Sequence, residues 1–208
     1  MRQGNFPALD VCPPSMKFLV VAATSLVAAV GSARPPADLP DVGPAPALVG
    51  STWINTEKPI TLKSLKGKVV LVHFWTLACI NCKHNLPQYN EWFKQFKDQK
   101  FAMIGIHTPE LDFERELSNV QDAVKAHDIK YPVLVDGKAQ NWDNWRQEYW
   151  PAIYLLDKRG HIRERWNGEL EFNHAGGTAR IEREIKELLD EPDEAAAPVQ
   201  ADSPRIAP

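Results

Sequence analysis

The segment Val69–Cys82, VVLVHFWTLACINC, decides how the rest of the chain is interpreted. Its first six residues, Val69 to Phe74, are nearly all apolar or β-branched, which predicts a buried strand. A short turn follows, and after it the pair Cys79 and Cys82. Apolar residues then recur at three- and four-residue spacings, so we expect the cysteines to lie at the start of an amphipathic helix.

Cysteines at a helix start are chemically activated. Unpaired backbone N–H groups and the positive end of the helix dipole stabilise a thiolate, which is the reactive form of cysteine. Cys79 is therefore predicted to be the attacking thiol. Cys82 follows after two intervening residues and can reach back to resolve a mixed disulfide by forming the Cys79–Cys82 bond.

These residues resemble the active-site segment of thioredoxin. The shared features are Phe74-Trp75 before the CxxC pair and Pro87 five residues after it, where thioredoxin has a proline that kinks its helix. Within the thioredoxin-like family, WTLACINC and the later stretch Ile106-His-Thr-Pro-Glu110 resemble the periplasmic thioredoxin domains of the TlpA and DipZ type, and related domains fused to NHL repeats. The resemblance covers residues 51–189.

The order of predicted elements indicates the fold class. Strand and helix patterns alternate after the cysteines, which implies parallel pairing, and two strands joined by a hairpin loop precede a last helix. We expect an α/β thioredoxin fold, with a mixed sheet of four to five strands and helices on both faces. Residues 53–55 and 60–62 predict a small β-hairpin before this sheet. The resemblance implies such an N-terminal extension in the TlpA-like group.

The 208-residue chain divides into four regions. Residues 1–33 have the layout of a secretory signal peptide, because an uncharged apolar run of thirteen residues follows Met16-Lys17, and Met16 is a candidate start of translation. An uncleaved anchor is the alternative, although a span needs about 20 apolar residues. The proline-rich residues 34–50 predict an extended linker, residues 51–190 the thioredoxin-like domain, and residues 191–208 a disordered tail.

Charge and cysteine content narrow the functional class. The formal net charge of −3 comes without a basic block, which argues against binding to DNA or other nucleic acid. Cys12 precedes the apolar run and would leave with it, so the mature chain would keep only Cys79 and Cys82. We expect a periplasmic or otherwise exported protein that is soluble after cleavage, is a monomer, and needs no cofactor or metal.

The resemblance implies further residues at the site. Pro151 follows Trp150 and matches the family's cis-proline, which lies against the cysteines and exposes backbone to an extended substrate segment. Only proline makes a cis bond readily accessible. Trp75 is expected to pack beside the thiolate. We therefore predict that Trp75, Trp150 and Pro151 contact the substrate, while core packing remains an alternative for the tryptophans.

The cycle also needs a group that accepts the proton of Cys82. Thioredoxin has an Asp immediately before its Phe-Trp, and this chain has His73 there. A histidine inside a buried strand is more often a core residue. Glu110 is the better candidate, because the resemblance implies an acid near the resolving cysteine at this place. A solvated acid near a helix N-terminus is the alternative interpretation of Glu110.

Two other functions would use the same thiols. Copper carriage would combine them with a histidine such as His84 or His107, since soft thiolates suit Cu(I). A thiol peroxidase is suggested by Thr76, three residues before Cys79 as in the peroxiredoxin pattern. That pattern requires a proline where this chain has Val72, which weakens the peroxidase interpretation.

The residues together predict an exported thiol-disulfide oxidoreductase. Cys79 would attack the disulfide of a protein substrate lying across Pro151, and Cys82 would release the reduced product. Ile80 and Asn81 lack the histidine of strongly oxidising enzymes, which favours a reductant or a mid-potential exchanger. In an oxidising compartment a reductant needs electrons. The resemblance implies a membrane thiol-transfer protein as the donor, and cytochrome c maturation among the pathways served.

Overall fold

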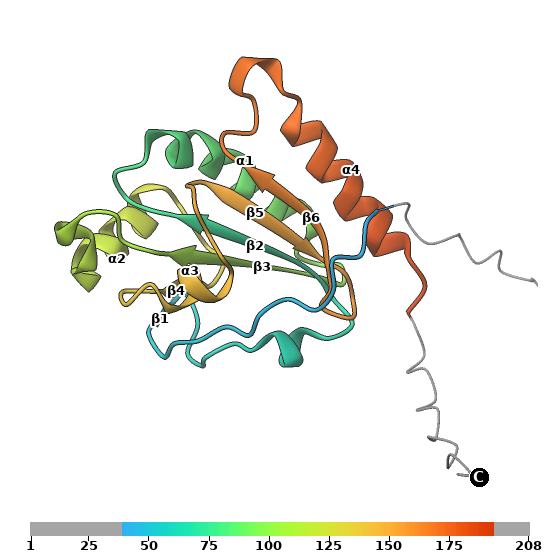
Figure 1. Cartoon of the computed structure of the whole chain (residues 1–208), viewed down its shortest axis with the longest axis horizontal. Coiled ribbons are helices and arrows are strands. Elements are labelled where there is room, and N and C mark those ends of the chain that lie inside the picture. Colours follow the sequence, from blue (N-terminus) through green and yellow to red (C-terminus); the bar gives the residue numbers. More distant parts are fainter. Residues whose placement is uncertain (1–38, 194–208) are drawn as a thin grey trace, which may run out of the picture. The chain divides into compact units, whose positions relative to one another are not determined.

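A mixed sheet of six strands lies at the centre of the protein, in the order β1-β4-β3-β2-β5-β6 (Figure 1). The structure, a computed structural model, describes residues 39–193. Strands β2, β3 and β4 are parallel, whereas β1, β5 and β6 each run antiparallel to a neighbour. The strands are β1 Trp53–Ile54, β2 Val69–Trp75, β3 Phe101–His107, β4 Val133–Val135, β5 Ala152–Leu156 and β6 Ile162–Asn167.

Helices cover both faces of this sheet, as predicted. The α-helices are α1 Ile80–Phe96, α2 Leu117–Ala126, α3 Gln140–Asn144 and α4 Gly177–Asp190, and the 3-10 helices are η1 Leu62–Leu65, η2 Asp112–Arg115 and η3 Phe172–His174. Residues of α1, α2 and α4 pack on one face, and residues of α3 with the segment before β2 pack on the other. Figure 1 shows α1 and α4 above the sheet and α3 below it.

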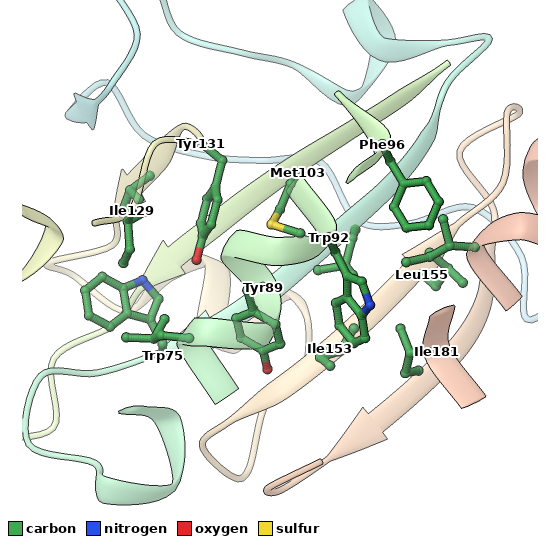
Figure 2. Packing of buried hydrophobic residues seen from close by; sticks show 14 of the residues in the cluster. Trp75, Tyr89, Trp92, Phe96, Met103, Ile129, Tyr131, Ile153, Leu155 and Ile181 are labelled. Atoms are coloured by element: carbon green, nitrogen blue, oxygen red, sulfur yellow. The ribbon is translucent and has the colours of Figure 1, made fainter. Parts of the chain in front are cut away.

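The central strand β2 is buried at every position, which is why its sequence is an almost unbroken apolar run. Alternate side chains enter different cores. Val69, Leu71 and Trp75 join the cluster beneath α1 and α4, and Val70, Val72 and Phe74 join the cluster on the other face. Figure 2 shows the first cluster around Tyr89 and Trp92 of α1. The strand predicted over residues 69–74 is confirmed and extends by one residue.

The predicted N-terminal β-hairpin is wrong for the described residues. Trp53 and Ile54 pair antiparallel with β4, and residues 62–65 form η1 in place of a second strand. Asn55 ends β1 with a positive φ of 61°, and its amide donates to the carbonyl oxygens of Ile129 and Tyr131. These bonds hold the segment against the β4 side, and the sheet gains a sixth strand beyond the four to five predicted.

Residues 39–50 are held against the domain, so the linker predicted over residues 34–50 is not a free spacer in its described part. The N–H of Val42 donates to Ile162 O at 3.0 Å, and the N–H of Ile162 donates to Gly43 O at 2.9 Å. The Arg163 guanidinium also donates to the carbonyl oxygens of Leu39 and Pro40. Residues 42–45 run antiparallel to the start of β6 and to the turn before it.

The first and last of the four predicted regions lie largely outside the described residues. The predicted signal peptide and most of the predicted tail fall on residues 1–38 and 194–208. The first tail residues are attached to the domain, because Glu191 pairs with Arg163 at 3.0 Å and Asp193 pairs with Lys158 at 3.1 Å. Between residues 39 and 193, no helix has the length and apolar character to cross a membrane.

Candidate active site

The strand directions bring several loops to one end of the sheet. Strands β2 and β3 are parallel, so their carboxyl ends lie together. Strand β5 runs antiparallel to β2, and β6 antiparallel to β5, so the start of β5 and the end of β6 reach the same end. Residues 76–79, 108–111, 149–151 and 168–171 therefore gather there. The carboxyl ends of strands are the usual place for sites in such sheets.

The cysteine pair occupies the N-terminus of α1, as predicted. Cys79 is the N-cap residue with extended backbone dihedral angles, and its Sγ accepts a hydrogen bond from the N–H of Cys82 at 3.2 Å. Both cysteines are free thiols. Cys82 is fully buried in the first turn, whereas Cys79 is partly exposed. A substrate can therefore reach Cys79 and not Cys82.

The two thiols differ strongly in acidity. The hydrogen bond from the Cys82 thiol, helped by the backbone N–H groups of Cys82 and Asn81, lowers the pKa of Cys79 to about 7 against the opposing effect of burial. Burial raises the pKa of Cys82 far above its ordinary value, and the contact with Cys79 raises it further. Near neutral pH, roughly half of Cys79 is thiolate while Cys82 remains protonated.

The peptide bond between Trp150 and Pro151 is cis, which confirms the predicted isomer. The carbonyl oxygen of Pro151 accepts a hydrogen bond from the N–H of Gly168 at 2.7 Å, which joins the loops before β5 and after β6. The Trp150 ring lies on Trp142 with centroids 3.9 Å apart. This ring is half-buried, so Trp150 retains surface that a substrate can contact.

Trp75 belongs to the core. It is 1 % exposed, and its ring meets the edge of His107 with centroids 5.2 Å apart. Figure 2 shows Trp75 beside Ile129 and Tyr131 in the core cluster. Trp75 therefore presents almost no surface to a substrate, and its predicted role as a substrate contact gives way to the core-packing alternative.

The two proton-acceptor candidates lie in opposite surroundings. Glu110 is exposed on the loop after β3, and its negative charge raises the pKa of both Cys79 and Cys82. His73 is fully buried, and burial lowers its pKa to about 3. Its ring packs against Tyr89 with centroids 4.4 Å apart, and neither ring nitrogen has a hydrogen-bond partner in the described structure. His73 is therefore a neutral core residue, which confirms its interpretation as part of the core.

Two buried polar residues at the site were missed in the sequence. Asn85 lies one turn after Cys82 and bonds to the loop after β6. Glu114 accepts hydrogen bonds from the loop before Cys79 and from the loop after β3. A signal existed for each. Asn85 interrupts the apolar face of a helix, and Glu114 stands at the third position of a short helix, where a glutamate commonly bonds back to the helix start.

Sequence comparison identifies the family of the chain. A family model described as the AhpC/TSA family matches residues 43–165, which is more than half of the 208 residues. The chain belongs to the AhpC/TSA family.

Individual relatives place this AhpC/TSA member among thioredoxin-like proteins. It is 45% identical to Protein DipZ of Mycobacterium bovis over 140 residues, which cover 66% of this chain and 20% of DipZ. It is 32% identical to the thiol-disulfide oxidoreductase YkuV of Bacillus subtilis over 151 residues, covering 71% of this chain and 95% of YkuV. The chain therefore spans about a fifth of DipZ and nearly all of YkuV.

A solved structure agrees with these relatives. The solution structure of a thioredoxin-like protein in the oxidised form matches with a TM-score of 0.61 at 30% identity, covering 70% of this chain and 94% of that chain. The resemblance to thioredoxin-like proteins of the DipZ type and the predicted fold class are confirmed. The chain has the thioredoxin-like fold, and Cys79 and Cys82 form a CxxC pair at the N-terminus of α1.

The copper and peroxidase interpretations gain no support at this AhpC/TSA site. Within residues 39–193, no three histidine, cysteine or acidic side chains are grouped to hold a metal ion. His107 is buried against Trp75, and His84 pairs with Glu169 at 3.1 Å, so both rings have neighbours other than the thiols. The hydroxyl of Thr76, the residue that suggested the peroxidase interpretation, donates to Glu114.

Proposed function

We propose that this protein is an exported thiol-disulfide oxidoreductase that reduces or exchanges disulfides of protein substrates. The observation that carries the proposal is that the two cysteines differ in accessibility and in pKa. Cys79 is accessible and has a pKa of about 7, while Cys82 is buried beside it with a raised pKa. An attacking thiol works best when its pKa is near the ambient pH, and a resolving thiol must wait until the mixed disulfide has formed.

The proposed cycle transfers two electrons from the dithiol to the substrate. The Cys79 thiolate attacks one sulfur of the substrate disulfide, which forms a mixed disulfide and releases the other sulfur as a thiolate. Cys82 then loses its proton and attacks Cys79 Sγ. The Cys79–Cys82 disulfide forms, and the second substrate sulfur leaves as a thiolate that takes up a proton. Glu110, whose charge acts on both thiols, is the proposed acceptor of the Cys82 proton.

Apolar side chains at the redox end of the sheet support a protein as substrate. Ile80 of α1, Phe113 of η2, Tyr149 before β5 and Phe172 of η3 are each at least half exposed, and all four follow or precede strand ends at this end of the sheet. Exposed large apolar side chains near a reactive group can contribute to a protein-binding site. Pro151 and Trp150 lie in the same group of loops, where we propose that an extended substrate segment contacts them.

Export, the electron donor and the direction of electron flow are parts of the proposal supported by the sequence. The apolar run after Lys17 supports cleavage of a signal peptide, and the dithiol then needs reduction outside the cytosol. A membrane thiol-transfer protein is the proposed donor. A reduction potential near that of thioredoxin, about −270 mV, would support a reductant, whereas one near −120 mV would make the protein an oxidant.

The proposal is tested with insulin as a protein disulfide substrate and dithiothreitol as the electron source. The wild-type protein should accelerate insulin reduction, and the Cys82→Ser variant should accumulate a mixed disulfide between Cys79 and an insulin chain, detected by non-reducing mass spectrometry. The Cys79→Ser variant, the matched control, should do neither. Wild-type activity in Cys79→Ser, or trapping through Cys82, would overturn the proposed roles. Titration of the reduced protein with Cu(I) tests the copper alternative separately.

A further inference from the structure

The carboxylate of Glu114 joins two loops at the redox end of the sheet. Its Oε1 accepts a hydrogen bond from the N–H of Ala78 at 2.6 Å, and its Oε2 accepts from the Thr76 hydroxyl. The same Oε2 accepts from the N–H groups of Glu110 at 2.6 Å and Leu111 at 3.1 Å. Thr76 and Ala78 lead from β2 to Cys79, whereas Glu110 and Leu111 follow β3.

These contacts continue the β2–β3 connection beyond the point where backbone pairing stops. The ladder between the two strands ends with Trp75 opposite His107, and one more bond follows from the N–H of Thr108 to Trp75 O at 3.1 Å. Past this point the chains separate, one toward α1 and the other toward η2. Glu114 bridges the gap with its side chain. The loop that leads to Cys79 is therefore tied to the loop that follows β3.

Glu114 works as an anion and not as a proton carrier. The residue is fully buried, and burial acts to raise its pKa. Hydrogen bonds from Thr76 and from the N–H groups of Glu110, Leu111 and Ala78 outweigh burial and hold the pKa of Glu114 below its ordinary value. Hydrogen bonds to a charged group are stronger than those between neutral groups, and loss of the carboxylate would leave four donors without their acceptor.

We propose that Glu114 is a positioning residue for Cys79, acting through the backbone of Ala78. The inference deepens the oxidoreductase function proposed above and rests on it. Ala78 directly precedes Cys79, whose Sγ must stay within reach of the Cys82 N–H at 3.2 Å. That hydrogen bond and the contact with the Cys82 thiol stabilise the Cys79 thiolate. An anchored Ala78 keeps Cys79 in this N-cap position.

The experiment compares Glu114→Gln with Glu110→Gln. Loss of a positioning residue should raise the midpoint pH of Cys79 ionisation, whereas loss of a nearby negative charge should lower it. The charge of Glu110 raises the pKa of Cys79, so Glu110→Gln should move the midpoint of Cys79 ionisation below about 7. A glutamine at position 114 turns an amide NH₂ toward backbone donors and releases Ala78. Glu114→Gln should therefore move the midpoint above 7 and slow alkylation of Cys79 at pH 7 about threefold or more.

The readouts are thiolate absorbance near 240 nm across pH and the rate of alkylation by iodoacetamide. Glu184→Gln is the control for general destabilisation, since Glu184 is a buried acid of α4 paired with Arg180 at 2.9 Å. It should lower stability without moving the Cys79 midpoint. If Glu114→Gln does not fold, Thr76→Val removes one donor from the same carboxylate and should shift the midpoint upward by a smaller amount.

Each outcome decides the proposal. A midpoint that falls or stays unchanged in folded Glu114→Gln, or in Thr76→Val when the first variant does not fold, overturns the positioning role. The titration needs no substrate, so it is independent of catalysis. If the wild-type protein does not reduce insulin, the proposed function is refuted. The midpoint of Cys79 ionisation in Glu114→Gln would still test the positioning role.

Discussion

The Oδ1 atom of Asn85 accepts a hydrogen bond from the backbone N–H of Leu170 at 2.9 Å, although 85 positions separate the two residues. The Asn85 amide also donates to Tyr89 Oη at 3.0 Å and to Gly168 O at 3.2 Å. Gly168 in turn donates its N–H to Pro151 O at 2.7 Å. A buried side chain of α1 is thus linked through Gly168 to the loop that contains the cis-proline.

Replacing Asn85 by alanine should both destabilise the protein and disturb the redox site. The change leaves the Leu170 N–H and Gly168 C=O without their side-chain partner, and a buried unpaired polar group costs about 1–3 kcal/mol. We expect Asn85→Ala to lower the free energy of unfolding in urea by about 2 kcal/mol or more, and to slow insulin reduction. Asn90→Ala is the matched control, because Asn90 lies on the same helix and donates to His127 O instead. Equal effects of the two variants on insulin reduction would contradict the prediction.

Iodoacetamide should alkylate Cys79 and leave Cys82 unmodified. Only the thiolate reacts, so the alkylation rate of Cys79 should rise with pH through a midpoint near 7 and level off above it. Cys82 is buried with a raised pKa and should remain unmodified over the same range. Peptide mass spectrometry after timed alkylation of the reduced protein separates the two sites. Modification of Cys82 before Cys79, or a midpoint near 9, would count against this assignment.

Two buried histidines should make the fold sensitive to acid. Burial lowers the pKa of His73 to about 3 and that of His107 to about 4. The unfolded chain binds these protons below about pH 6.5, while the folded chain does not. Stability should therefore be full above pH 6.5 and fall by about 1.4 kcal/mol per pH unit for each histidine on acidification toward those values.

His73→Phe removes one of these contributions and keeps an aromatic ring against Tyr89 and Tyr131. Urea unfolding of the variant should show a shallower loss of stability from pH 6.5 to 4 than the wild type. His107 is present in both proteins, so the loss of stability that remains in the variant should reflect its protonation. Identical pH slopes for the wild type and the variant would show that His73 is not held neutral by the fold.

Arg163 connects both ends of the described chain. Its guanidinium donates to Leu39 O and Pro40 O and pairs with Glu191 and the buried Asp157. Breaking a buried ion pair from one side costs about 3 kcal/mol. Arg163→Ala should lower the free energy of unfolding by about that amount, and should expose both ends to limited proteolysis.

Arg165→Ala, on the same strand but exposed, is the matched control for this prediction. The cleavage sites of a broad-specificity protease, mapped by mass spectrometry, should appear near residues 39–45 and 191–193 in Arg163→Ala and not in Arg165→Ala. Release of only one end would show that the other is held independently of Arg163.

The sequence supported those features that depend on local pattern or on the family motif. The burial of β2, the N-cap position of Cys79 and the neutral core setting of His73 follow from an apolar run and its flanking residues. The cis bond before Pro151 came from the resemblance alone, because nothing local distinguishes it from a trans bond.

The features that were missed depend on contacts between distant segments. The hairpin prediction failed because β1 pairs with β4, about 80 residues away, and residue-by-residue propensity carries no information on such a partner. Glu114 reads as an ordinary surface acid until the loop before Cys79 is placed next to it. Trp75 matched the family motif, but its burial depends on the packing of α1 and the loop around Ile129.

Residues 42–45, which lie beside the start of β6, limit where a protein substrate can pair with the sheet. A strand with a free outer side can recruit an extended polypeptide by backbone pairing, and the substrate proposed here is an extended segment of a protein. Residues 42–45 already take up hydrogen bonds of β6 and its preceding turn, and the opposite border of the sheet ends in the two-residue β1. The start of β6 and the two-residue β1 are therefore poor templates for backbone pairing, and we expect a protein substrate to bind at the loops that surround Cys79 instead.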